Sequence, residues 1–419
     1  MTPDARGAQL ELTVGPVGHG GFCVARHEGR VVFVRHALPG ERVQAVVTED
    51  RGGSYCRADA VAVLEPAAGR VAPPCPASGP GGCGGCDFQH VDPRVQRELK
   101  AQVVAEQLRR IAGLDIAVTV QELPGGLLGW RTRTRLAVDG SGQPGFRIHR
   151  SHTVLPVPAC PLAVTGSLDA VLARRWRPGG ELEVVADDSS QVQVVQLPAG
   201  RPPKQLRGTG RVVRNAAGRR WELSARAFWQ VHPAAADALA ALVRDWASAP
   251  LGGTVWDLYG GVGLFASVLA GQVGPTGTVT VVEASRRAVA DGAAALADLG
   301  QVRFVQGRVE QALAQLPGPP DVVVLDPPRR GAGRQVATAV ADRRPARIVH
   351  LACDPAALAR DVAAYLQCGY RLLTVRALDA FPMTHHVECI AVLAPDGDSC
   401  GGCGDEDAPC GRTGSGRLS

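Results

Sequence analysis

The sequence predicts an α/β fold in which a small β-barrel and a mostly β central region precede an open, mostly parallel sheet. Short alternating runs punctuated by glycine fill residues 8–66, which is the pattern of a small barrel. Later apolar runs each lead into a polar or reactive side chain, as strands of a parallel sheet do, at 255–258, 279–283, 321–325 and 349–352. We therefore expect domains at 1–67, 68–222 and 223–395, with a polar, disordered tail at 396–419.

Composition and charge indicate a globular intracellular protein. The 419 residues suffice for two to three domains, and a net charge of only +5 means that any nucleic-acid surface must be local. No window reaches the roughly 18 uninterrupted apolar residues of a membrane span, and residues 1–6 lack the apolar core of a signal peptide. We expect a cytoplasmic monomer with no membrane partner, whose twelve cysteines serve metal binding or catalysis.

The N-terminal region contains five short strand-like runs, which predict a barrel of the size that binds oligonucleotides. Its string Gly18-His-Gly-Gly-Phe22, followed by Val32-Phe-Val-Arg-His-Ala-Leu-Pro-Gly-Glu41, resembles a TRAM domain, a family of small RNA-binding barrels. The resemblance implies that basic side chains on the barrel meet RNA phosphates. A solvated basic face is the alternative.

The central region holds four cysteines with the spacing of a metal centre. Cys75, Cys83 and Cys86 form a Cys-x7-Cys-x2-Cys pattern, and Cys160 supplies a fourth thiolate. Zinc and a four-iron cluster both accept four cysteines, and the spacing does not separate them. The same region contains a helix pattern at 92–112, begun by Asp92-Pro93, whose apolar face includes Leu99, Val104 and Ile111.

Three arginines alternate along a predicted strand of the central region, at Arg131, Arg133 and Arg135. Residues two apart point to the same face of a strand, so these side chains would form one basic stripe. The stripe is a candidate RNA contact, and a polar sheet face is the alternative.

A strand ending in Asp257 runs into the glycine loop Tyr259-Gly260-Gly261-Val-Gly263 and then into a helix, which lets the backbone approach a ligand closely. Glu283 ends the next strand, where an acid can bind ribose hydroxyls. The glycines do not match the dinucleotide-binding pattern. The string from Asp257 resembles the S-adenosylmethionine loop of class I methyltransferases, and this resemblance implies a Rossmann-like domain.

Two further loops carry reactive groups. A buried strand delivers Asp326-Pro-Pro-Arg329, and the next predicted strand ends at Cys353, where open α/β sheets bind ligands. A cysteine at that position can act as a nucleophile if its thiolate is stabilised. Downstream, His385-His-Val-Glu388 precedes the last strand. A small residue finishing a strand is the alternative for Cys353.

Taken together, these motifs resemble those of the RNA 5-methyluridine methyltransferases, in particular the branch with an iron–sulfur cluster, over residues 8–394. The resemblance implies a 4Fe-4S cluster on Cys75, Cys83, Cys86 and Cys160, Cys353 as nucleophile and Glu388 as base. It implies S-adenosylmethionine contacts from Gln230, Asp257, Tyr259, Gly260, Gly261, Gly263, Glu283 and Asp326. The implied substrate is a uridine in structured RNA, with large-subunit ribosomal RNA favoured over transfer RNA.

Two departures from the family pattern bear on this interpretation. Seven residues separate the first two cluster cysteines where five are usual, and Asp354 follows the nucleophile where the family usually has asparagine. The added negative charge would raise the pKa of Cys353. The alternatives are an RNA cytosine-C5 methyltransferase, which typically uses a second cysteine that the Asp326 loop lacks, and a non-catalytic RNA-binding cluster protein.

Overall fold

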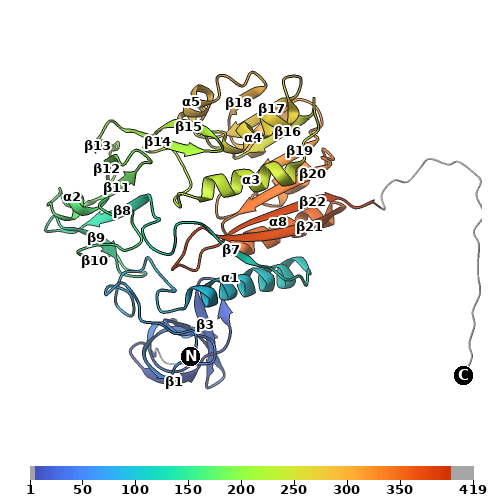
Figure 1. Cartoon of the computed structure of the whole chain (residues 1–419). Helices are drawn as coiled ribbons and strands as arrows, with labels where there is room; N and C mark the ends of the chain where they lie inside the picture. The colour runs from blue at the N-terminus through green and yellow to red at the C-terminus, as the bar shows by residue number, and fades with distance from the viewer. Residues whose placement is uncertain (1–4, 398–419) are drawn as a thin grey trace, which may run out of the picture.

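A computed structural model describes residues 5–397 and begins with a small barrel built from a six-stranded sheet (Figure 1). Inward-facing side chains such as Val34, Val43 and Ala45 alternate with exposed ones and form the barrel core. The structure has one more strand here than the sequence predicts, the short β2. The order in the sheet is β1-β5-β6-β4-β3-β2, with β1 at Gln9–Thr13, β2 at Val17–Gly18, β3 at Phe22–His27, β4 at Arg30–Arg35, β5 at Arg42–Asp50 and β6 at Tyr55–Glu65.

The predicted helix at 92–112 forms as α1 (Pro93–Gln107) and continues into a π-helical turn, Leu108–Ala112. Asp92 caps it by accepting a hydrogen bond from the backbone N–H of Arg94 at 2.9 Å. Leu99 packs with the barrel's Leu38, while Val104 packs into the core beneath α8. The prediction that Ile111 belongs to the apolar face is wrong, because the extra residue of the π turn rotates this side chain to 37% exposure.

The central region is an antiparallel sheet in the order β10-β9-β8-β11-β12-β13, followed by a separate hairpin. Leu136, Leu182 and Val194 fill its core. Its elements are β8 (Arg133–Val138), β9 (Pro144–Arg147), β10 (Val154–Leu155), α2 (Asp169–Leu172), β11 (Gly180–Ala186), β12 (Val192–Pro198), β13 (Lys204–Arg207) and the hairpin β14 (Arg211–Ala216) and β15 (Arg219–Ser224).

The C-terminal region is an eight-stranded sheet in the order β18-β17-β16-β19-β20-β22-β21-β7. The first five are parallel, β22 runs antiparallel to both of its neighbours, and β7 from the segment after α1 completes the edge. The strands are β7 (Val120–Glu122), β16 (Thr254–Leu258), β17 (Thr278–Glu283), β18 (Val302–Gln306), β19 (Val322–Leu325), β20 (Arg347–Ala352), β21 (Tyr370–Asp379) and β22 (Glu388–Pro395).

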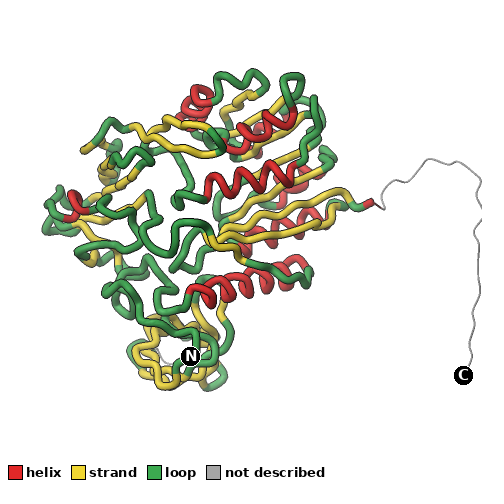
Figure 2. Tube along the Cα trace, in the orientation of Figure 1, coloured by secondary structure: helices red, strands yellow, loops and turns green. Residues whose placement is uncertain are grey.

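Helices cover both faces of this sheet, as Figure 2 shows. Strand residues alternate between two cores: Val322 and Val324 face the core that includes α3 and α4, whereas Val323 and Leu325 face the core that includes α7 and α8. The helices are α3 (Ala235–Ala247), α4 (Leu264–Val273), α5 (Arg286–Ala295), α6 (Val309–Ala312) with the 3₁₀ turn Leu313–Gln315, α7 (Arg334–Ala341) and α8 (Pro355–Gln367). The expected class I arrangement of an α/β sheet with a preceding barrel is confirmed.

Within residues 5–397, no helix has the length and apolar character needed to cross a bilayer. The tail predicted to be disordered lies, apart from its first two residues, outside the described part of the chain.

Candidate active site

The glycine loop joins β16 to α4 and can be built only with glycine at two positions. A β-carbon on Gly260 would lie 2.6 Å from Cγ1 of Val281, and one on Gly263 would lie 2.8 Å from Cδ1 of Leu296. Gly261 and Gly263 also have positive φ angles of 58° and 85°, which glycine adopts without steric cost. The loop therefore exposes its backbone at the carboxyl end of the sheet.

Two acids hold this loop from beneath. Asp257 is fully buried, accepts a hydrogen bond from the backbone N–H of Ala266 at 3.0 Å, and has its pKa raised to about 8 by burial. Glu283 accepts hydrogen bonds from the N–H of Gly261 at 3.1 Å and of Ser285 at 2.6 Å. Glu283 thus fixes the loop through the backbone of Gly261, and Asp257 fixes the first turn of α4, which follows the loop.

A small pocket opens above the loop and collects five of the eight predicted cofactor residues: Gln230, Tyr259, Gly260, Gly261 and Asp326. Asp257, Gly263 and Glu283 lie around it without lining it. The sequence interpretation missed Phe228, which also lines the pocket although its side chain is 67% exposed. Its position two residues before Gln230 is the sequence feature that could have indicated a role in the same pocket.

The predicted nucleophile and base lie at the same end of two paired strands. Strands β20 and β22 pair in antiparallel register from Ile348 opposite Leu393 to Ala352 opposite Cys389. The same register, continued by one residue, places Cys353 opposite Glu388. Directly opposed residues of an antiparallel pair project toward the same face with their β-carbons about 4.5–5.5 Å apart. Cys353 is half-buried and Glu388 is only 4% exposed.

These groups and Asp326 influence one another electrostatically. The pKa of Cys353 is raised to about 12 by burial first, then by the nearby Glu388 and Asp326, while Arg329 acts in the opposite direction. Burial and Asp326 raise the pKa of Glu388 well above its usual range, and burial raises that of Asp326 to about 7. The arrangement therefore favours the protonated form of Glu388 and brings the pKa of Asp326 close to neutral.

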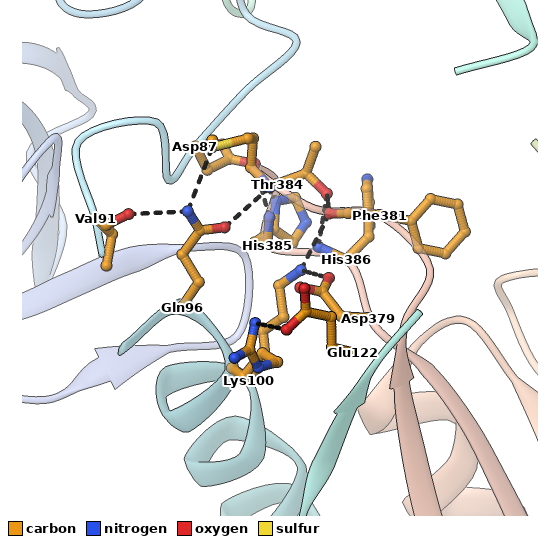
Figure 3. A network of polar contacts seen from close by, with 12 residues as sticks. Asp87, Val91, Gln96, Lys100, Glu122, Asp379, Phe381, Thr384, His385 and His386 are labelled. Atoms are coloured by element: carbon orange, nitrogen blue, oxygen red, sulfur yellow. Dashed lines mark hydrogen bonds and ion pairs between the residues drawn. The ribbon is translucent and has the colours of Figure 1, made fainter. Parts of the chain in front are cut away.

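Contacts from distant segments fix the loop that precedes Glu388, as Figure 3 shows. The buried Lys100 of α1 donates to Asp379 at 2.6 Å and to the carbonyl oxygen of Phe381 at 3.0 Å. Gln96 accepts a hydrogen bond from the N–H of Met383 at 2.9 Å, and Asp87 contacts Nδ1 of His385 at 2.6 Å. Helix α1 and the cysteine loop therefore position the strand that carries Glu388.

The four predicted metal ligands, Cys75, Cys83, Cys86 and Cys160, line one small cavity. Its other walls include Phe146 and Val157, and Gln89 donates a hydrogen bond to Sγ of Cys86 at 3.0 Å. Among the described residues no three His, Cys, Asp or Glu side chains are close enough to hold a single metal ion. Thiolates are the ligands that a four-iron cluster takes, one for each iron, and the cavity supplies four cysteines.

The arginine stripe is largely paired within the protein. Arg133 lies 3.2 Å from Glu183, and Arg135 lies 3.1 Å from the same carboxylate. Arg131 stacks on the ring of Trp130, with 5.0 Å between the guanidinium carbon and the ring centroid. The stripe therefore offers less free charge to RNA than its sequence suggests.

Comparisons with known proteins agree with this arrangement. A TRAM domain model matches residues 3–61, and a tRNA (uracil-5-)-methyltransferase model matches residues 319–395, which include Asp326, Cys353 and Glu388. An RNA methyltransferase from Streptomyces coelicolor is 44% identical over 93% of each chain. A 23S rRNA (uracil(1939)-C(5))-methyltransferase from Alkalilimnicola ehrlichii is 33% identical over 92% of this chain and 96% of its own.

The fold has a solved counterpart that spans the whole arrangement. The crystal structure of a tRNA (uracil-54, C5)-methyltransferase from Pyrococcus abyssi, in complex with S-adenosyl-L-homocysteine, superposes with a TM-score of 0.69. The match covers 92% of this chain and 100% of that one at 20% identity, so it supports the fold alone.

Proposed function

Because the chain belongs to the RNA uracil-C5 methyltransferase family, we propose that it methylates carbon 5 of a uridine in large-subunit ribosomal RNA through a covalent adduct with Cys353. The observation that carries this proposal is that Cys353, Glu388 and Asp326, which also lines the small pocket, lie near enough for both acids to act on the pKa of Cys353. The 33% identical relative named for 23S rRNA favours the ribosomal substrate.

Carbon 5 of uracil is a weak nucleophile, so its direct attack on a methyl sulfonium is slow. A nucleophile and a base together provide a faster route. The Cys353 thiolate adds to carbon 6, and the electron pair of the 5,6 double bond moves into an enolate whose carbon 5 is nucleophilic. When bound in the pocket, S-adenosylmethionine would supply the methyl group that carbon 5 takes up, with S-adenosylhomocysteine as the other product. Glu388 then removes the proton from carbon 5, the double bond re-forms, and Cys353 departs as thiolate.

The pocket residues support this sequence of steps. Gln230, Tyr259, Gly260 and Asp326 would bind the cofactor, with Glu283 near the ribose side of the loop. A sulfonium in this pocket brings positive charge toward Asp326, which favours ionisation of both acids. The target base must leave its stack to reach Cys353 and Glu388.

The proposal is tested with total RNA from cells lacking the gene, tritiated at carbon 5 of uridine and cytidine. We expect tritium release with the wild-type protein and none with Cys353→Ala. Glu388→Gln should instead accumulate a covalent protein–RNA adduct, because elimination requires loss of the carbon 5 proton. Normal turnover by Glu388→Gln would contradict its role as base. Release from cytidine would indicate the cytosine-C5 alternative, and tight binding without release would indicate the non-catalytic one.

We also propose that Cys75, Cys83, Cys86 and Cys160 hold a 4Fe-4S cluster with a structural role. The shared cavity that all four cysteines line supports this, because the ligands of one cluster must surround a single site. Protein purified without air should be brown and contain about four irons and four sulfides per chain. Cys160→Ala should lose colour and iron, and a colourless zinc protein would contradict the assignment.

A further inference from the structure

One wall of the small pocket above the glycine loop has no secondary structure of its own. Residues 228–230, which we call the wall segment, line this pocket and include Gln230. They follow β15, which ends at Ser224, and precede α3, which begins at Ala235. Residues 225–234, all within the described part of the chain, form no helix or strand. The position of the wall segment therefore depends on contacts with other parts of the chain.

Two neighbouring residues of the central region hold both ends of the wall segment. Arg133, the first residue of β8, donates from Nη2 to the carbonyl oxygen of Ala227 at 2.7 Å. Thr132 donates from its backbone N–H and from its hydroxyl to the carbonyl oxygen of Val231, each at 3.0 Å. Ala227 and Val231 are the residues directly before and after the wall segment, so these hydrogen bonds fix it at its two ends.

The two donors are themselves shielded and held in place. Thr132 is 7% exposed, and the side chain of Arg133 is 19% exposed. Nη1 of Arg133 lies 3.2 Å from the carboxylate of Glu183 on β11, while Nη2 reaches the wall segment. The carbonyl oxygen of Thr132 accepts a hydrogen bond from the backbone N–H of Ala186 on the same strand at 2.9 Å. Hydrogen bonds from a charged or shielded donor are stronger than exposed neutral ones, so these contacts can set the position of the wall segment.

We propose that Thr132 and Arg133 are positioning residues for the cofactor, which hold the wall segment against the glycine loop so that Gln230 meets S-adenosylmethionine. The inference rests on the cofactor pocket of the proposed function. It gives Arg133 a role other than the RNA contact that its place in the arginine stripe suggests. A phosphate contact needs an accessible guanidinium, whereas Nη1 and Nη2 of Arg133 already have partners within the protein.

The affinity for S-adenosylhomocysteine tests this without RNA, by isothermal titration calorimetry on the full-length protein. Arg133→Met should raise Kd by about threefold to thirtyfold, because the wall segment loses a charge-assisted hydrogen bond. Thr132→Val keeps the shape of the side chain and the backbone hydrogen bond, so it should raise Kd by about twofold to fivefold. A Kd equal to the wild-type value for Arg133→Met would overturn the proposal.

Arg135→Met is the matched control. Arg135 belongs to the same stripe and lies 3.1 Å from the same Glu183 carboxylate. Its replacement removes an equal charge from this carboxylate and leaves the hydrogen bonds to Ala227 and Val231 in place. The Kd for S-adenosylhomocysteine should therefore stay at the wild-type value. An equal rise for Arg133→Met and Arg135→Met would assign the effect to the charge balance around Glu183 and overturn the proposal.

RNA binding separates the positioning role from a phosphate contact. Filter binding with unmodified large-subunit ribosomal RNA over a range of salt concentrations should give the same affinity and salt dependence for Arg133→Met and wild type. A phosphate contact would instead weaken binding and lower the slope of log K against log salt by about one. That result, with an unchanged Kd for S-adenosylhomocysteine, would overturn the proposal. Loss of both ligands by Arg133→Met would mean that this variant does not fold, and Thr132→Val then decides, because a wild-type Kd for that variant would overturn the proposal.

Turnover gives a further readout. Arg133→Met should raise KM for S-adenosylmethionine by about threefold to thirtyfold, while KM for RNA and kcat at saturating cofactor change by less than about twofold. A larger effect on KM for RNA than on KM for the cofactor would overturn the proposal. Failure of the wild-type protein to bind S-adenosylhomocysteine would contradict the proposed function itself, whereas wild-type binding that neither variant changes would overturn this inference alone.

Discussion

At the scale of single residues, the glycine loop at 259–263 requires glycine at position 263 for a steric reason that does not apply to Gly271 in the helix that follows. Gly263 has a positive φ and almost no space for a β-carbon, so Gly263→Ala should lower the free energy of unfolding by about 1–3 kcal/mol and weaken cofactor binding. Gly271, exposed in the same helix with nothing near its missing β-carbon, is the matched control. Gly271→Ala should stabilise the protein by about 0.5–1 kcal/mol. Denaturant unfolding measures both, and equal effects would contradict the steric argument.

At the scale of secondary-structure elements, a buried ion pair between Lys100 and Asp379 joins α1 to the end of β21. Lys100→Met leaves the buried Asp379 without its partner and should cost about 3–5 kcal/mol of unfolding free energy. Lys100→Met with Asp379→Leu should recover much of this loss, since both charges are then gone. The exposed pair of Arg110 and Glu106 serves as control, because Arg110→Met should change stability by no more than about 0.5 kcal/mol. If Lys100→Met alone and the double variant lost the same unfolding free energy, the loss would come from altered packing and not from an unpaired charge.

At the scale of the whole molecule, the barrel, the cysteine loop and the central region together line a groove of about 940 Å³. Phe22, Phe33 and Tyr55 form a ladder in it with ring centroids 4.7 and 5.3 Å apart, and Arg57 lies against the rings. Bases of unpaired RNA stack on such platforms for about 1–3 kcal/mol each. Tyr55→Ala should therefore raise KM for RNA about fivefold to 100-fold with little change in kcat. Val61→Ala, an exposed change on the same strand, should leave both unaltered; an equal effect of the two variants would contradict stacking.

The sequence predicts those parts of the site that lie within short strings. Cys353, Asp326 and the glycine loop each follow an apolar strand, so their places at the carboxyl edge of a parallel sheet follow from the pattern. The helix at 92–112 can also be predicted from the sequence, because its N-cap residue and the spacing of its apolar residues are local features.

Contacts between distant residues could not be predicted in this way. His19 and Asp354 are 335 positions apart, and Lys100 and Asp379 are 279 apart, so no local pattern relates them. The pairing of the arginine stripe with Glu183 depends on the register between β8 and β11, which alternation alone does not determine. The π turn that exposes Ile111 also lacks any signal in the spacing of apolar residues.

The close approach of Gly21 to His385 has a consequence for how this architecture can be rearranged. Gly21 of the barrel lies against the loops that carry Asp87 and His385 and leaves no room there for a side chain, so the barrel fits that surface closely. Grafting the first 67 residues of a distant relative onto this chain should misplace those loops unless the segment around Asp87 is transplanted with them. The barrel and the catalytic sheet are therefore not interchangeable modules, and lineages that reshuffle them are expected to carry the cysteine loop along.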